Sequence, residues 1–247
     1  MGTDRSVEWT IRVARVFATN TVIAERDGKA VIVDAGAGVA HKVIQTVADK
    51  GLEPVALLIT HGHVDHTWDA ATIQDSLDIP VVISTHDRYY LDDPFGLNPS
   101  RPERRDPNDM LVHAFGAAGL RAESFRTPRD IVEWGSTASI AVEKDLDSIW
   151  QKRWRKIASP GHTPGSTVYE FGLDAPSPLV CTGDVIFKSS IGRTDLPGGN
   201  SAVMKNTLFM LSRSIPAAAT IVAGHGPTTT MELESRTNPY LPKPNQP

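Results

Sequence analysis

The segment HGHVDH at 61–66 places three histidines and one aspartate within six residues, directly after the continuous apolar run at 54–60. A continuous apolar run of this length is typical of a strand that is covered on both faces. Imidazoles and carboxylates are the ligands that zinc and iron accept, and histidines at alternate positions can converge on one ion. The segment therefore predicts a metal site at the carboxyl end of a buried strand, where α/β proteins place their sites.

Other metal-competent residues in the chain also follow apolar runs that we expect to be strands. They are His162, Asp184 and His225. With the first segment they make five histidines and two aspartates, which is enough for two ions that share a bridging ligand. The predicted metal ligands are His61, His63, Asp65, His66, His162, Asp184 and His225. We expect the remaining histidines to have no part in the site.

The rest of the chain alternates between strand-like and helix-like segments. The apolar runs predict strands at 9–17, 21–25, 30–36, 54–60, 80–84, 130–134, 139–143, 154–159, 166–172, 178–183 and 220–224. Apolar spacing of three and four residues predicts helices at 39–51, 66–77, 84–91, 109–119 and 201–213. Under this assignment, residues 143–153 are additional sequence between two strands. This order of elements is the signature of an α/β fold.

One domain is the simplest organisation for these 247 residues, and we assign it the whole range 1–247. Residues 92–108 are rich in Pro, Arg and Asp and have no apolar period. We therefore expect residues 88–128 to form a cap or insertion beside the site. The Pro-rich tail at 241–247 is expected to fray.

Composition excludes several classes of protein. The chain has 25 Lys and Arg against 29 Asp and Glu, and this net charge of −4 argues against a nucleic-acid partner. Its single cysteine, Cys181, excludes an internal disulfide framework and a zinc site built from cysteines. No apolar run approaches the roughly 18 residues of a membrane span, and residues 1–10 have no apolar signal region. We expect a cytoplasmic protein that acts on a small molecule, without a membrane partner, in an oligomeric state that the sequence does not specify.

The order of four motifs resembles the metallo-β-lactamase-fold hydrolases. These motifs are H-x-H-x-D-H, then GHTPGS at 161–166, TGD at 182–184 and GHGP at 224–227. The stretches 183–200 and 234–241 are similar to the small, one-domain glyoxalase II-like (hydroxyacylglutathione hydrolase-like) branch. The resemblance covers about residues 9–241. It implies an αββα sandwich, with two mixed sheets between helical layers and the site at one edge.

The resemblance also implies how the ligands divide between two divalent metal ions. One ion would be held by His61, His63 and His162, the other by Asp65, His66 and His225, and Asp184 would bridge them. We expect zinc, with iron or manganese as alternatives. Two such ions can hold a hydroxide near neutral pH and polarise a carbonyl. Asp65 would have the catalytic role of orienting that hydroxide.

Three further residues have two interpretations each. Arg193 lies where the glyoxalase II pattern has a basic residue that contacts the carboxylate of the thiol carrier, so it is a candidate substrate-binding residue. The alternative for Arg193 is a structural ion pair with Asp195. Asp34 is either a turn carboxylate or a support for a ligand histidine. We expect Cys181 to be a small buried hydrophobe rather than a ligand.

The leading functional hypothesis is a dinuclear hydrolase that cleaves a thioester, such as an S-acyl derivative of a low-molecular-weight thiol. A leaving thiolate has a pKa near 8.5 and needs little proton assistance, which suits a site without a separate general acid. The alternatives are a persulfide dioxygenase with a single iron, a lactonase or β-lactamase-type hydrolase of the same fold, and a non-catalytic or RNA-processing member. The complete ligand set and the net negative charge weaken the last alternative.

Overall fold

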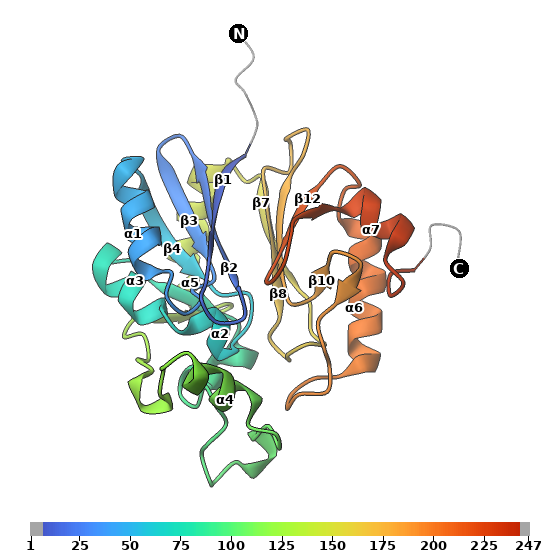
Figure 1. Ribbon diagram of the computed structural model, residues 1–247. Coiled ribbons are helices and arrows are strands. Elements are labelled where there is room, and N and C mark those ends of the chain that lie inside the picture. The colour runs from blue at the N-terminus through green and yellow to red at the C-terminus, as the bar shows by residue number, and fades with distance from the viewer. Residues whose placement is uncertain (1–6, 243–247) are drawn as a thin grey trace.

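The computed structural model describes residues 7–242, which form two β-sheets packed face to face with helices on both outer faces (Figure 1). The first sheet has the strand order β1-β2-β3-β4-β5-β6. Its strands are β1 (Glu8–Val13), β2 (Asn20–Arg26), β3 (Lys29–Val33), β4 (Glu53–Leu58), β5 (Val81–Ile83) and β6 (Ile131–Glu133). Strands β1 to β3 are antiparallel, whereas β3 to β6 are parallel. The sheet is therefore mixed.

The second sheet has the strand order β13-β12-β9-β8-β7. Its strands are β7 (Trp154–Ala158), β8 (Thr167–Phe171), β9 (Leu179–Gly183), β12 (Thr220–Ala223) and β13 (Thr229–Thr230). Only β9 and β12 run parallel; the other pairs are antiparallel. A small hairpin of β10 (Ile186–Phe187) and β11 (Ser190–Ile191) follows β9.

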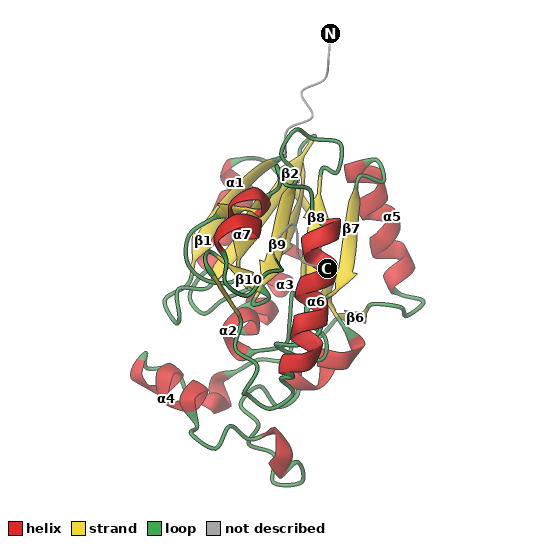
Figure 2. Ribbon diagram, turned by 90° about the vertical axis from the view of Figure 1, so that its right-hand side faces the viewer, coloured by secondary structure: helices red, strands yellow, loops and turns green. Residues whose placement is uncertain are grey.

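The main core lies between the sheets, where Val31 and Leu58 of the first sheet are in the same buried cluster as Tyr169 and Cys181 of the second. Alternate residues such as Ile32 face outward, into a second cluster under helices α1 (Ala40–Asp49) and α3 (Ala70–Leu77). Helices α6 (Ser201–Ser214) and α7 (Met231–Thr237) cover the other sheet (Figure 2). Strands buried on both faces explain the unbroken apolar runs in the sequence. The expected αββα sandwich is confirmed.

One predicted strand is wrong. Residues 139–143 begin helix α5 (Ser139–Trp150), so residues 143–153 are the body and end of a core helix rather than extra sequence between strands. The apolar run within this segment, residues 140–142, is too short to distinguish strand from helix, and the deciding signal is the longer spacing. Val142, Leu146 and Trp150 follow helical spacing and are buried in the cluster between the sheets.

The segment 88–128 lies beyond the end of the sheets in Figure 1, mostly as loops. It contains the end of the 3₁₀ helix η1 (Thr85–Leu91), then η2 (Pro102–Arg104), helix α4 (Met110–Ala117) and η3 (Ala122–Ser124). Phe115 of α4 is fully buried against Trp68, with ring centroids 4.8 Å apart. The segment is therefore anchored to the sandwich beside α2 (Val64–Thr67).

At the chain end, Leu241 is buried beneath α6 and α7, so the predicted frayed tail does not begin there, and residues 243–247 lie outside the described part. No helix within residues 7–242 is long and apolar enough to cross a membrane.

Candidate metal centre

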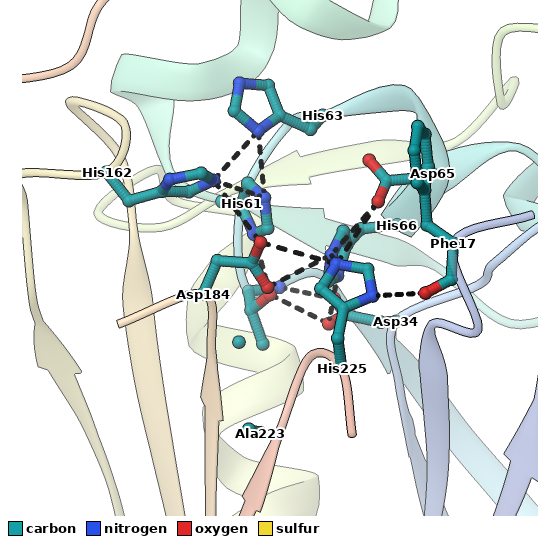
Figure 3. A network of polar contacts seen from close by, with 12 residues as sticks. Phe17, Asp34, His61, His63, Asp65, His66, His162, Asp184, Ala223 and His225 are labelled. Atoms are coloured by element: carbon teal, nitrogen blue, oxygen red, sulfur yellow. Dashed lines mark hydrogen bonds and ion pairs between the residues drawn. The ribbon is translucent and has the colours of Figure 1, made fainter. Parts of the chain in front are cut away.

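The seven predicted ligands converge at the edge of the sandwich where strands from both sheets end (Figure 3). The segment after β4, continuing into α2, supplies four of them, and the β7–β8 connection supplies His162. Asp184 follows β9 and His225 follows β12. Because β4 belongs to one sheet and β9 and β12 to the other, the cluster joins the two halves of the sandwich. The full set is His61, His63, Asp65, His66, His162, Asp184 and His225.

Three imidazoles form the first group. His61 Nε2 lies 3.1 Å from His63 Nδ1, and His162 Nε2 lies 3.2 Å and 2.9 Å from these two atoms. Nitrogen ligands at the zinc distance of about 2.1 Å in a tetrahedron are about 3.4 Å apart. The three nitrogens therefore have nearly the spacing that a single ion requires.

The second group consists of Asp65, His66 and His225. His225 Nε2 lies 3.3 Å from both His66 Nε2 and Asp65 Oδ2. Asp184 lies between the groups: its Oδ1 is 3.4 Å from His66 Nε2, and its Oδ2 is 3.4 Å from His225 Nε2 and 3.6 Å from His162 Nε2. Asp184 Oδ1 is buried without a hydrogen-bond partner. A shared position between two ions would satisfy this carboxylate.

Backbone and carboxylate oxygens fix the orientation of three ligand imidazoles. His162 Nδ1 donates to the carbonyl of Arg193 at 2.7 Å, and His225 Nδ1 donates to the carbonyl of Phe17 at 2.9 Å. His66 Nδ1 donates to Asp34 Oδ2 at 2.8 Å, which supports the role of Asp34 as a partner of a ligand histidine. Because Nδ1 is the donor in each of these bonds, Nε2 of each imidazole faces the cluster, where it can bind a metal ion in place of a proton. Nitrogen and carboxylate oxygen atoms that face one another fit a cation between them, so the donor set fits divalent metals.

The electrostatics of the cluster also suit a cation. Burial lowers the pKa of His61 and His63, reinforced by neighbouring imidazoles, and that of His63 falls to about 3. Burial alone would raise the pKa of Asp184, but His66 and His225 hold it well below its usual value. Asp184 in turn helps to raise the pKa of His225 to about 9 against the effect of burial. The carboxylates are therefore ionised at neutral pH and would attract metal ions.

A cavity of about 400 Å³ opens over the cluster. Besides ligand side chains and Arg193, its walls are largely apolar: Phe17, Met110, Leu111, Phe187, Ile191 and Leu196. Met110 and Leu111 come from α4, so the 88–128 segment contributes directly to the cavity. Phe17, Met110 and Leu111 could not be predicted as cavity residues from the sequence, because an apolar residue in a loop or short helix carries no signal of a pocket.

Arg193 lies at this cavity, but its guanidinium is already paired. Nε and Nη2 donate to the two carboxylate oxygens of Asp195 at 2.7 and 2.8 Å, and 44% of the Arg193 side chain is exposed. The hydrogen bond from Arg193 lowers the pKa of Asp195 to about 2. The structure thus shows the expected ion pair, while the contact with substrate stays a prediction.

A family model described as the metallo-beta-lactamase superfamily matches residues 14–225. The chain belongs to this superfamily. It is a metal-dependent hydrolase of the metallo-β-lactamase fold, and seven of its residues form the cluster of candidate metal ligands.

Related proteins align with nearly the whole length of this chain. An uncharacterised protein of Mycobacterium tuberculosis is 34% identical over 89% of this chain and 91% of its own. The probable metallo-hydrolase YqgX of Bacillus subtilis is 29% identical over 95% of this chain and 98% of its own. The hydroxyacylglutathione hydrolase GloC of Haemophilus influenzae is 28% identical over 90% of this chain and 91% of its own.

Two solved structures are similar over the same extent. The di-iron-bound form of TTHA1623 has a TM-score of 0.71 and 25% identity, covering 94% of this chain and all of its own. The B3 metallo-beta-lactamase BLEG-1 has a TM-score of 0.68 and 26% identity, covering 95% of this chain and 99% of its own.

Proposed function

We propose that this metallohydrolase cleaves a thioester, an acyl derivative of a small thiol. The observation that carries the proposal is the chemistry of the cavity wall. Its titratable side chains are candidate metal ligands or Arg193, and none of the described lining residues is a free acid with a raised pKa. Without a proton donor, the favoured substrate is one whose leaving group departs as an anion near neutral pH, and a thiolate does so far more readily than an alkoxide.

The chain's own residues have distinct tasks in this proposal. Two divalent ions, zinc in our proposal, would be held by the seven residues and would supply Lewis acidity and an acidified water. Asp65 is held ionised by His66 and His225, so it can accept a hydrogen bond from the attacking water. The apolar side chains of Phe187 and Leu111 offer a surface for the acyl chain. The cavity of about 400 Å³ suits a small molecule.

The printed names of two similar proteins support parts of this proposal. GloC of Haemophilus influenzae is named as a hydroxyacylglutathione hydrolase, and TTHA1623 is described in a di-iron-bound form. The second ligand group here is complete and separately oriented through Asp34 and the Phe17 carbonyl. This arrangement favours two ions over the single iron of the persulfide dioxygenase alternative. Iron in place of zinc remains the alternative for the metal.

A pair of substrates with the same acyl group tests the reaction. We expect the purified, metal-loaded protein to release thiol from an acyl thioester, measured with a thiol-reactive dye. The matched oxygen ester should be cleaved at least about 100-fold more slowly, because its alkoxide needs protonation. Oxygen uptake on a persulfide, with the thioester left intact, would favour the dioxygenase. Faster cleavage of a lactone would favour the lactonase alternative.

A further inference from the structure

Asp87 is a buried carboxylate that lies outside the ligand set and joins two of the loops that carry ligands. It belongs to η1 and is fully buried. Its Oδ2 accepts from the backbone N–H of Gly62 at 2.9 Å, and Gly62 stands between the candidate ligands His61 and His63. The same Oδ2 accepts from Thr163 Oγ1 at 2.7 Å, one residue after His162. Its Oδ1 accepts from Gly165 N–H at 2.7 Å.

The two glycines that donate to Asp87 are closely packed against η1. A Cβ added to Gly62 would lie 2.5 Å from the ring of Tyr90, and one added to Gly165 would lie 2.5 Å from the carboxyl carbon of Asp87. Tyr90, also in η1, stands edge-on to His63 with ring centroids 5.2 Å apart. The helix η1 therefore presses on both loops of the first ligand group. The imidazoles of the second group are oriented by other hydrogen-bond partners, namely the carboxylate of Asp34 and the carbonyl of Phe17.

The charge of Asp87 has no cationic side chain as an ion-pair partner within residues 7–242; its hydrogen-bond donors are all neutral. Burial raises the pKa of Asp87, and the three hydrogen bonds lower it only in part. A buried charge of this kind is costly unless a nearby opposite charge offsets it. A cation held by His61, His63 and His162 would provide that opposite charge. These ligands are adjacent in the chain to Gly62 and Thr163, which donate hydrogen bonds to Asp87.

From this geometry we propose that Asp87 is a positioning residue for the first metal ion, which it holds through the Gly62 and Thr163 loops and stabilises by its charge. This role of Asp87 affects metal affinity and does not depend on which substrate the protein cleaves. Replacing Asp87 with Asn removes the charge and places an amide N–H₂ against a backbone N–H donor. Either the hydrogen bond from Gly165 N–H or the one from Gly62 N–H must then be lost.

The proposal is tested by measuring zinc affinity by chelator competition in variants that retain only one of the two ligand groups. In a His225→Ala background, which keeps the first group, we expect Asp87→Asn to weaken zinc binding by about tenfold or more, the effect of losing one charged hydrogen bond. In a His63→Ala background, which keeps the second group, the change should be less than about threefold. Thr163→Val, which keeps the charge, should have a smaller effect than Asp87→Asn in the first background.

Glu234 provides a matched control for general loss of stability. It is also fully buried and also accepts from three neutral donors, namely Ser189 N–H, Thr229 Oγ1 and Asn238 Nδ2. Glu234→Gln should destabilise the fold, measured by urea unfolding, while leaving the zinc affinity of the first group within about threefold. Unchanged affinity in Asp87→Asn, or equal losses in both backgrounds, would overturn the proposal. If a background variant binds no zinc, Asp87→Asn and Glu234→Gln are each made in the otherwise unaltered chain and their zinc contents are compared. We expect a lower zinc content in Asp87→Asn, and equal zinc contents would overturn the proposal.

Discussion

At the scale of single residues, the ligand types were visible in the sequence but their supports were not. The carbonyls of Phe17 and Arg193 orient His225 and His162 across 208 and 31 positions in the chain. Every residue has a backbone carbonyl, so no residue type marks such a partner. Asp34 was a candidate because a carboxylate can accept from an imidazole, yet only the fold shows that His66 is its partner. Sequence motifs therefore identify ligands better than they identify what orients them.

Arg193 gives a prediction at this scale, because its pairing with Asp195 competes with any substrate anion. Arg193→Ala should raise KM about tenfold for a thioester whose thiol carries a carboxylate, the effect of one charged hydrogen bond, and should leave kcat and metal content unchanged. Asp195→Asn should lower the same KM, because it frees the guanidinium. Steady-state kinetics with a neutral thioester as control measures both. Equal effects of either variant on both substrates would mean that the pair is only structural.

The pH dependence of the pair follows from the pKa of Asp195, which the hydrogen bond from Arg193 lowers from 3.8 to about 2. A carboxyl group whose folded pKa is depressed contributes its stabilisation above the unfolded pKa and loses it as the pH falls through the folded pKa. The pair should thus be intact above about pH 4 and be lost toward pH 2. In Arg193→Ala, the NMR titration midpoint of the Asp195 carboxyl should move back up toward 3.8.

At the scale of elements, the long periodic helices were predicted with nearly correct bounds, whereas one short apolar run was assigned to the wrong type of element. The helix predicted at 39–51 is α1 (Ala40–Asp49), and the helix predicted at 201–213 is α6 (Ser201–Ser214). The helix predicted at 66–77 is divided into α2 and α3, because residues 68 and 69 interrupt it. Residues 139–143 were misassigned because a short segment with three apolar residues fits a strand equally well. Leu146 and Trp150 pack into the core between the sheets, and this packing favours the helix α5 over a strand.

Helix α4 gives the prediction at this scale. Met110 and Leu111 line the cavity from the 88–128 segment, which we expect to act as a cap over the metal edge. Replacing both with Ala should raise KM for a long-chain acyl thioester about 30-fold, because each truncation removes about 1 kcal/mol of apolar contact, and should leave zinc content unchanged. His113→Ala, on the exposed side of the same helix, is the matched control. Loss of zinc in the double variant would show instead that α4 is part of the metal centre's framework.

At the scale of the whole molecule, the metal centre connects the two sheets. The segment after β4 carries His61 and Asp65 from the first sheet, whereas Asp184 and His225 follow strands of the second. The first residue of β2 also contacts the second sheet, since Asn20 Nδ2 donates to the carbonyls of Ala223, at the end of β12, and Gly226, both at 2.9 Å. Ions bound here would tie the two halves of the sandwich together, so metal binding and folding stability should be coupled.

The last prediction measures this coupling and the number of ions together. The protein should bind two divalent ions, because the seven ligand atoms form two groups and Asp184 reaches both. Free zinc at 100 times the Kd of one site should stabilise the fold by about 2.7 kcal/mol, which raises Tm by about 5–10 °C for a chain of this size. Asp184→Ala should weaken both sites and remove most of this shift, whereas loss of His63 should weaken mainly one. Metal analysis of dialysed protein and thermal unfolding at fixed zinc concentrations measure the two quantities. A stoichiometry of one at saturating metal would contradict the dinuclear assignment and favour a single-ion centre.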